Sequence, residues 1–468
     1  MNVAICIYLL LVVLLGIVGI LKTKTFEDHV VANRELPWGI AALSIAATLI
    51  GTGATLGVGE MAYKIGISSM LYPTILGVSL LVSMFVAAAR FRASNCYTIP
   101  ELLSADYGET SRYVLAVATI LRWVGPTAAQ FLAAGVVLTS ITGWDLTITI
   151  IVSACVILFY TILGGMWSAS ITDALQVIVI YIALVLLSTL TIKEFGGMSQ
   201  LLSKLPSEFS SWTNVGIVPL TSWLGGLISL GFVSQPWLQR CASVTTPKNA
   251  VKAGILAGLL VLPVGLLSAY VGVLARVQLP GLDAKAAVPA VIMNTFSPFV
   301  AGIFVASIIA AAMSCADSWI HSSATLMVKD IYLRIKPNAS SKEVYRMTVY
   351  STIFVGILAL VLALMWKGGI IMLVMFTGVW SSVIYIGPLL VSWFLPIKLK
   401  PRVGLGIMLF LLVLGPVLLF SPNYIFKVHP NFSLAIIALA VTVISLLIPG
   451  ATYSDHKETV YDQSEVEA

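Results

Sequence analysis

The sequence predicts an all-α membrane protein with about thirteen transmembrane helices. Of its 468 residues, 59% are hydrophobic and only 10% are charged, whereas soluble globular proteins carry about 25% charged residues. Many of its apolar runs also reach the length of roughly 20 residues that a helix needs to cross a bilayer. These two observations exclude a soluble globular protein and predict a protein that is embedded in the lipid bilayer.

Thirteen apolar segments define the predicted helices in chain order. The first has no basic stretch before its apolar core and no small-residue cleavage site, so we expect a retained helix rather than a secretion signal. The sequence after the last segment, residues 450–468, is polar and acidic, and we expect a disordered tail. The segments are 2–22, 38–63, 66–90, 111–142, 145–164, 168–193, 219–239, 248–275, 296–331, 345–366, 369–396, 401–421 and 430–449.

The lysines and arginines predict how the chain is oriented. With thirteen spans the two termini lie on opposite sides, and basic residues favour the cytoplasmic side. If the N-terminus is outside, the cytoplasmic segments hold eighteen of the 26 lysines and arginines, and the opposite side holds seven. We therefore expect an integral protein of the plasma membrane with its N-terminus outside and the tail 450–468 in the cytoplasm.

Other features of the composition argue against several functions. The net charge of +6 comes from basic residues in the short loops of a membrane protein, so it does not indicate nucleic-acid binding. The five cysteines form no Cys-x-x-Cys pair and no cluster with histidine, so neither a disulfide framework nor a zinc site is expected. We expect no cofactor.

Glycine and proline interrupt two of the predicted helices. The span 38–63 contains LIGTGATLGVGE, and the span 219–239 contains WLGGLISLGFVSQPW. They are the first and sixth of ten core spans, so the interruptions fall at matching places in two five-helix halves, as in inverted-repeat transporters whose binding site lies at the breaks. Close packing of glycine-rich helices is the alternative, and the offset of five spans favours the repeat. The predicted parts are an extra helix at 2–22, a first repeat at 38–193, a second repeat at 219–396 and two extra helices at 401–449.

Three stretches resemble the sodium/solute symporter family. GGMWSASITDALQ (164–176) resembles the family signature at the start of core helix 5, and AAAMSCADSWIHSSATLMVKDIY (310–332) resembles core helix 8. SQPWLQRCASVTTPKNAVKAG (234–254) resembles the connection between core helices 6 and 7. The resemblance, nearer the proline and choline branches than the sugar branch, implies a leucine-transporter-type fold for residues 1–449. It also implies sodium-driven import of a small organic solute by alternating access.

The resemblance implies a sodium site where core helix 1 meets core helix 8. Sodium prefers oxygen ligands, including the carbonyls freed at a break in a helix. The family usually has Ser or Thr where this chain has Cys315, and because a thiol is a poor sodium ligand, the fifth ligand is open. For Ser314, a hydroxyl bonded back to its own helix is the alternative. The expected ligands are the carbonyls of Ala47, Ile50 and Ala311 and the hydroxyl of Ser314.

Asp173, Asp317 and Ser318 are candidates for a second cation site or for the path of a departing cation. Asp317 lies one turn beyond Ser314 on a face that also carries His321, and an ionisable residue inside the membrane is a functional-site hypothesis by default. The resemblance implies a functional carboxylate at Asp173. The alternatives are a helix cap for Asp173 and a structural pair between Asp317 and His321.

The resemblance places the solute against core helices 1, 3, 6 and 10. Candidates there are Thr52, Gln130, Trp223 and Trp380, although tryptophans also collect at membrane interfaces without a ligand. Arg122 lies about midway along the span 111–142. A charge at that depth costs at least about 2.5 kcal/mol, so we expect Arg122 to snorkel or to form an ion pair rather than to contact the solute.

The function expected from the sequence is therefore sodium-coupled symport, with sodium and a small organic solute as ligands, and not an enzyme activity. A proton-coupled transporter of the same fold is an alternative, because Asp317 could carry a proton. An intramembrane enzyme is a second alternative, for which Asp317, His321 and nearby serines are the only hint. Hydroxyl groups buried in membrane helices are too common to carry that hint.

Overall fold

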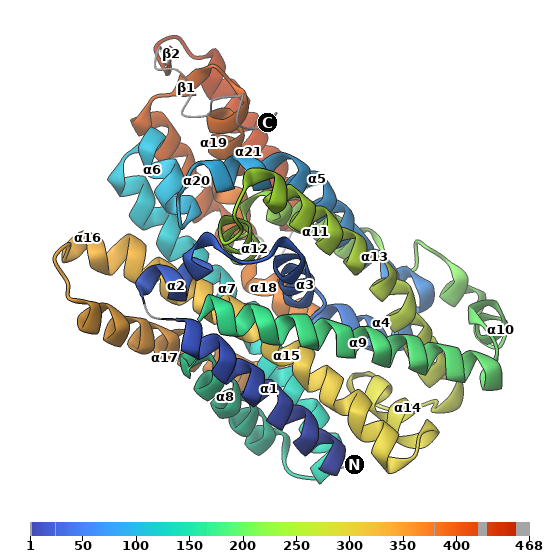
Figure 1. The fold of residues 1–468 in the computed structure, drawn as a ribbon. Coiled ribbons are helices and arrows are strands. Elements are labelled where there is room, and N and C mark those ends of the chain that lie inside the picture. Colours follow the sequence, from blue (N-terminus) through green and yellow to red (C-terminus); the bar gives the residue numbers. More distant parts are fainter. Residues whose placement is uncertain (1, 24, 164, 379, 420–427, 455–468) are drawn as a thin grey trace.

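The computed structural model is an almost entirely helical molecule (Figure 1). It describes residues 2–23, 25–163, 165–378, 380–419 and 428–454. Two short strands, β1 (Ile397–Leu399) and β2 (Thr452–Ser454), pair antiparallel with Lys398 opposite Tyr453. The first residues of the predicted tail therefore include a strand, and residues 455–468 lie outside the described part.

The helices follow the predicted apolar segments closely. Each of the thirteen predicted ranges contains helical residues. The α-helices are α1 (Asn2–Lys22), α2 (Phe26–Val31), α3 (Trp38–Leu49), α4 (Val58–Ile65), α5 (Leu71–Ala93), α6 (Ile99–Tyr107), α7 (Glu109–Thr142), α8 (Leu146–Leu163), α9 (Met166–Phe195), α10 (Met198–Leu202), α11 (Ile217–Val233), α12 (Gln235–Ala242), α13 (Pro247–Gln278), α14 (Ala287–Thr295), α15 (Pro298–Leu326), α16 (Leu333–Ile335), α17 (Ser341–Met365), α18 (Ile370–Gly378), α19 (Trp380–Phe394), α20 (Pro401–Leu419) and α21 (Pro430–Leu447). Short 3₁₀ or π segments are η1 (Ala32–Arg34), η2 (Gly53–Gly57), η3 (Gly66–Met70), η4 (Ser207–Ser210), η5 (Ala284–Ala286) and η6 (Met327–Tyr332).

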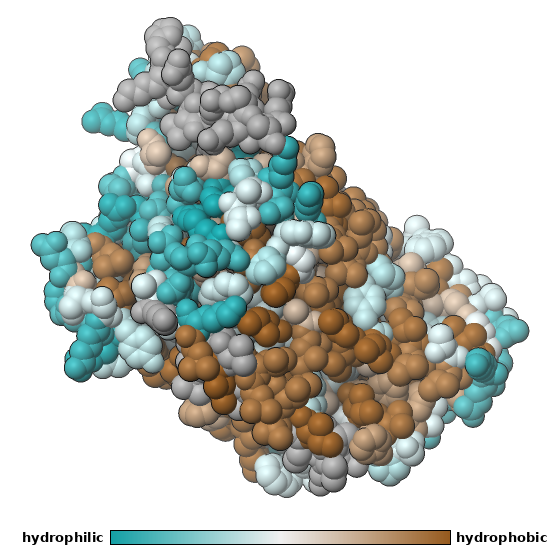
Figure 2. Space-filling model, in the orientation of Figure 1, coloured by the Kyte–Doolittle hydropathy of each residue, from teal (hydrophilic) through white to brown (hydrophobic). Residues whose placement is uncertain are grey.

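The surface is that of a membrane protein. Among the described residues, nine helices are long and apolar enough to cross a bilayer, and Trp38–Leu49 and Leu146–Phe159 are shorter apolar helices. Figure 2 shows a broad hydrophobic belt, with hydrophilic residues gathered at the end that carries α2, α6 and α16 and around α10. Large apolar side chains such as Phe85 and Phe159 are about 70% exposed, as expected for lipid-facing positions. The number of thirteen spans stays a prediction.

Core helix 1 is interrupted where its glycines predicted. α3 ends at Leu49, residues 50–52 are not helical, and the chain resumes through the π-helical η2 into α4. Core helix 6 is interrupted at Ser234, whose extended backbone separates α11 from α12. Pro236 lies in the first turn of α12, where its missing N–H removes no helical hydrogen bond. Both breaks are confirmed, and the inverted relation between the two halves stays a prediction.

The broken end of α3 lies inside the molecule. α3 packs against α9, α12, α13 and α15, and α15 also packs against α7 and α9. In Figure 1, α3, α12 and α18 lie at the centre of the bundle, with α1, α8 and α17 outside them. The carbonyls of the last turn of α3 are therefore enclosed by protein, the setting in which broken backbone is tolerated at membrane depth.

Arg112 and Arg240, two of the eighteen basic residues counted for the cytoplasmic segments, are buried in ion pairs. Arg112 and Arg240 are each 1% exposed. The Nε atom of Arg112 lies 2.6 Å from Asp330 Oδ1, which also accepts a hydrogen bond from Thr98. This pair joins the start of α7 to η6, beyond α15. Because these two arginines are not solvated, they are weaker evidence for the predicted orientation than exposed basic residues would be.

Candidate functional site

Three of the expected sodium ligands meet at the break in core helix 1. Ser314 Oγ lies 3.3 Å from the carbonyl oxygen of Ala47 and 3.2 Å from that of Ala311. Ala47 is in the last turn of α3, where carbonyls have no partner within the helix. Ile50 is the buried C-cap residue of the same helix, with φ −83° and ψ 44°. Oxygens from α3 and α15 therefore face one another at one place.

The Cys315 thiol faces the same broken helix end. Its Sγ atom lies 3.3 Å from the carbonyl oxygen of Ala47 and 2.9 Å from that of Thr48. The thiol is fully buried, and a Cβ on Gly51 would come within 2.3 Å of it. Cys315 thus donates to the carbonyls of Ala47 and Thr48 at the end of α3.

A buried polar cluster lies one turn further along α15. Asp173 Oδ2, on α9, accepts hydrogen bonds from Arg240 Nη2 at 3.0 Å and from Ser44 Oγ at 2.5 Å. Arg240 also donates to Ser44 and to Ser318 Oγ, and Ser318 lies 3.1 Å from the Thr48 hydroxyl. One guanidinium on α12 therefore connects α3, α9 and α15.

Asp317 belongs to this cluster and is not paired with His321. Its Oδ1 accepts a hydrogen bond from Ser318 Oγ at 3.2 Å, and its Oδ2 has no hydrogen-bond partner among the described residues. Within that part of the chain, no hydrogen bond or ion pair joins Asp317 to His321. Instead the His321 ring lies 5.0 Å from the ring of His29, and burial lowers the pKa of His29 to about 4, so His29 is neutral at physiological pH.

The charges in the cluster do not balance. Two buried carboxylates, on Asp173 and Asp317, face one guanidinium, on Arg240. Asp317 is 3% exposed and Asp173 is fully buried. An uncompensated charge in this low-dielectric setting is costly, so a cation or a proton is needed to neutralise it. The arrangement is suited to holding a positive ion near Asp317.

Two of the expected solute residues are in contact. Gln130 Oε1, on α7, accepts hydrogen bonds from the Thr52 hydroxyl at 2.7 Å and from its main-chain N–H at 3.2 Å. The third, Trp223, is buried on α11 and lies edge-on to Tyr72 at 5.6 Å between ring centroids. A Cβ on Gly53, next to Thr52, would lie 3.4 Å from the Tyr72 hydroxyl, so Tyr72 connects the two groups. The side chain of Trp380 lies outside the described residues.

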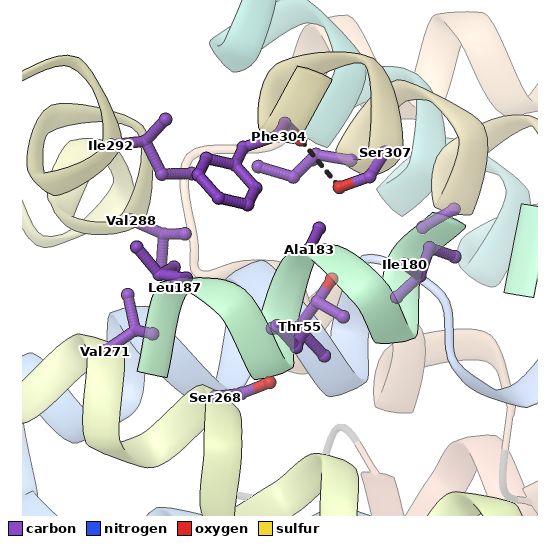
Figure 3. A pocket seen from close by; sticks show the side chains of 13 residues that line it. Thr55, Ile180, Ala183, Leu187, Ser268, Val271, Val288, Ile292, Phe304 and Ser307 are labelled. Atoms are coloured by element: carbon purple, nitrogen blue, oxygen red, sulfur yellow. Dashed lines mark hydrogen bonds between the residues drawn. The ribbon is translucent and has the colours of Figure 1, made fainter. Parts of the chain in front are cut away.

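A small cavity is lined in part by Ala311, one of the expected sodium ligands. It lies between η2, α9, α13, α14 and α15, and its volume is about 30 Å³. Figure 3 shows a mostly apolar wall with the hydroxyls of Thr55, Ser268 and Ser307 at its edges, and Ala311 completes the lining. This volume admits a water molecule but is far below the roughly 300 Å³ of a small-molecule pocket. The cavity therefore does not hold an organic solute.

Sequence reasoning missed three residues of this region. Arg240 was counted only among the basic residues of the cytoplasmic segments, and Ser44 and Tyr72 were not considered. A usable signal existed for Arg240, because two carboxylates inside a membrane require a cationic partner. Arg240 lies one turn after Pro236, on the helix that restarts core helix 6.

Comparison with known proteins now decides the family. The family model for the sodium:solute symporter family matches residues 29–395. The chain belongs to this family.

The chain is similar to symporters and transporters that are named for several different solutes. A sodium/pantothenate symporter of Haemophilus influenzae is 26% identical, over 73% of each chain. The high-affinity choline transporter 1 of Caenorhabditis elegans is 25% identical over 77% of this chain and 68% of its own, and a sodium/proline symporter of Staphylococcus aureus is 26% identical over 77% and 74%.

Solved structures show the shared fold. This chain superposes on a substrate-bound, outward-open Na⁺-coupled sialic acid symporter with a TM-score of 0.81, at 19% identity, covering 97% of this chain and 98% of the other. A nucleobase-cation-symport-1 family transporter in a closed conformation gives 0.60 at 13% identity, covering 94% and 97%. The leucine-transporter-type fold that the sequence motifs implied is thus confirmed.

The close approach of Gly51 to Cys315 gives the first prediction. Gly51→Ala places a methyl group 2.3 Å from Cys315 Sγ, so we expect it to push α3 from α15, to lower stability by about 1–3 kcal/mol and to reduce stabilisation by sodium. Adding Cys315→Ala makes room and should restore most of both. Melting temperatures in sodium chloride and in potassium chloride measure the effect.

The matched control is Gly39→Ala on the same helix, because a Cβ there meets nothing within 4 Å. If Gly51→Ala melts like Gly39→Ala in both salts, the tight contact has no energetic role.

Proposed function

We propose that this protein imports a small organic solute across the plasma membrane by alternating access, driven by the sodium gradient. The observation that carries the proposal is the convergence of Ala47 O, Ala311 O and Ser314 Oγ at the broken end of α3. Membership of the sodium:solute symporter family supports sodium as the coupling ion. In this proposal the N-terminus is outside, the C-terminal tail is cytoplasmic, and residues 1–449 form the transporting unit.

Sodium binds between α3 and α15 in this proposal. A hard cation is attracted to carbonyl and hydroxyl oxygens, and the last turn of α3 supplies carbonyls at the negative end of the helix dipole. The carbonyls of Ala47, Ile50 and Ala311 and the Ser314 hydroxyl are its ligands. The Cys315 thiol, which faces the carbonyl of Ala47, contributes only weakly to binding because sulfur is a soft ligand.

Asp173, Asp317 and Ser318 form a second cation site in this proposal. The excess of one negative charge over Arg240 supports it, since a bound monovalent cation would neutralise the cluster. Ser318 supports a link between the two sites because its hydroxyl donates to the carbonyl of Ser314 at 2.6 Å. An ion leaving the first site would therefore pass the Asp317 carboxylate.

The solute binds where core helices 1, 3 and 6 approach one another. Thr52 and Gln130 supply hydrogen-bonding groups, and the buried Gln130 Nε2 atom has no hydrogen-bond partner among the described residues. Trp223 and Tyr72 supply an aromatic wall. The solutes in the relatives' names, pantothenate, choline and proline, are all small and polar, which supports a small polar organic solute here.

Reconstituted protein tests the proposal directly. A thermal-shift screen of purified protein against small polar solutes, in sodium and in potassium, identifies the solute. Uptake of that solute into proteoliposomes should then require an inward sodium gradient. Uptake that is driven equally by a proton gradient without sodium would replace this proposal with proton coupling.

Removing the Ser314 hydroxyl should weaken sodium binding. Ser314→Ala deletes one oxygen ligand, so we expect the sodium concentration for half-maximal stabilisation to rise by about 10-fold or more, with protein abundance near that of the wild type. Cys315→Ser adds a hard oxygen and should preserve or tighten sodium binding. Loss of sodium binding in Cys315→Ser together with a silent Ser314→Ala would contradict the proposed site.

Neutralising Asp317 distinguishes a role in cation binding from a structural role beside His321. Asp317→Asn keeps the size of the side chain and removes its charge, so we expect normal folding with lost or shifted sodium dependence. His321→Gln should leave sodium dependence unchanged, because no bond joins His321 to Asp317 in the described structure. Sodium titrations of ²²Na⁺ binding to both variants measure this, and identical curves with only reduced abundance would contradict a cation role for Asp317.

A further inference from the structure

Several buried polar atoms between α1, α9 and α15 have no partner within the described structure. Tyr8 on α1 is 8% exposed and Gln176 on α9 is fully buried. The Tyr8 hydroxyl, both polar atoms of the Gln176 carboxamide, Asp173 Oδ1 and Asp317 Oδ2 all lack a hydrogen bond to a described residue. A polar atom that is buried without a partner destabilises the fold, so the concentration of such atoms at one interface calls for a ligand.

The register of the helices brings Tyr8 opposite Gln176. α1 and α9 pack against each other and run in opposite directions (Figure 1). Ser168 Oγ donates to the carbonyl of Gly16 at 3.0 Å. Eight residues back along α1 from Gly16 lead to Tyr8, and eight residues forward along α9 from Ser168 lead to Gln176, a rise of about 12 Å on each helix.

The electrostatic surroundings of Tyr8 agree with this register. The Gln176 carboxamide and the Asp173 carboxylate both lie close enough to the Tyr8 hydroxyl to act on it. Tyr8 and Val12 also pack against Ala306 and Ala310 of α15. The hydroxyl is therefore directed into the protein, towards the carboxylate side of α9, rather than towards lipid.

Gln176 lies between the levels of the two proposed cation sites. Asp173 and Asp317 act on one another across the contact between α9 and α15, and these helices also run in opposite directions (Figure 1). One turn outward from Asp173 is Gln176, and one turn outward from Asp317 is Ser314. Helix geometry therefore puts Gln176 nearer than Asp173 to the level of Ser314, on the side of α9 that faces α1.

We propose that Gln176 and Tyr8 form the outer part of the second cation site and supply neutral oxygens to the sodium ion that Asp173 and Asp317 neutralise. The inference rests on the second cation site of the proposed function. The Gln176 Oε1 atom and the Tyr8 hydroxyl are hard oxygens of the kind that sodium prefers, and they reach the ion directly or through one water. A helix outside the ten core helices would then belong to the coupling machinery.

The chemistry of the cluster favours this assignment over a purely structural one. The carboxylates and Arg240 leave one negative charge, which an ion can balance, but two carboxylate oxygens do not complete the oxygen shell of a sodium ion. Neutral oxygens add ligands without adding charge. A purely structural pair of Tyr8 and Gln176 would leave this negative charge unbalanced.

Binding of ²²Na⁺ to the purified full-length protein tests the inference. Tyr8→Phe removes only the hydroxyl, and Gln176→Leu removes both polar atoms at similar volume. We expect each variant to weaken sodium affinity by roughly 3- to 10-fold. The loss should fall on the same class of sodium sites that Asp317→Asn affects. The matched control is Tyr181→Phe, which removes another unpartnered hydroxyl from α9 and should leave sodium binding unchanged.

Melting temperatures distinguish a cation role from a structural one. Without sodium, Tyr8→Phe and Gln176→Leu should melt at or above the wild-type temperature, because an unpartnered buried polar group is removed. The gain in melting temperature on adding sodium should shrink in both variants and stay normal in Tyr181→Phe.

The outcomes separate this inference from the proposed function. Wild-type sodium binding in Tyr8→Phe and Gln176→Leu, with altered binding in Asp317→Asn, overturns the inference alone. Unaltered binding in all three overturns the second cation site and the inference with it. A fall in the sodium-free melting temperature with unchanged sodium affinity shows a structural role and also overturns the inference.

Discussion

The site depends on the enclosed carbonyls at the end of α3. Inside a bilayer, main-chain carbonyls that leave a helix must find partners in protein, water or an ion. Here the last turn of α3 meets Ser314 and Cys315 of α15, and Gly51 allows the two helices to approach closely. A cation between these oxygens would hold α3 against α15, so occupancy of the site and the relative position of the two helices are coupled.

Arg240 extends this coupling to the other broken helix. Its guanidinium reaches Asp173, Ser44 and Ser318 from α12, the segment that follows the break in core helix 6. Movement of α12 would therefore alter the charge that faces Asp173 and Asp317. In a symporter, this provides a physical route by which a conformational change raises or lowers the affinity for a cation, without requiring a contact between cation and solute.

Much of the fold could be predicted from the sequence, and less of the site. Hydrophobic runs set the helices, and the glycines of LIGTGATLGVGE marked the break in core helix 1, because both signals are local. The family motifs singled out Ala47, Ala311 and Ser314, whose oxygens the structure brings together, and their role as sodium ligands stays a prediction. Arg240 was misplaced because its sequence neighbourhood reads as a loop, and only the fold brings it to Asp173. Tyr72 and Tyr8 were missed for the same reason, since their partners are distant in sequence.

The central claim is that the residues around the broken end of α3 and the uncompensated carboxylate of the Asp173–Asp317–Arg240 cluster each bind a sodium ion. The most direct test is the stoichiometry of ²²Na⁺ binding to purified protein at equilibrium, with potassium replacing sodium at constant ionic strength. The account predicts saturable binding that reaches two sodium ions per chain and is not displaced by potassium. Absence of saturable sodium binding, or equal binding of potassium, would contradict it.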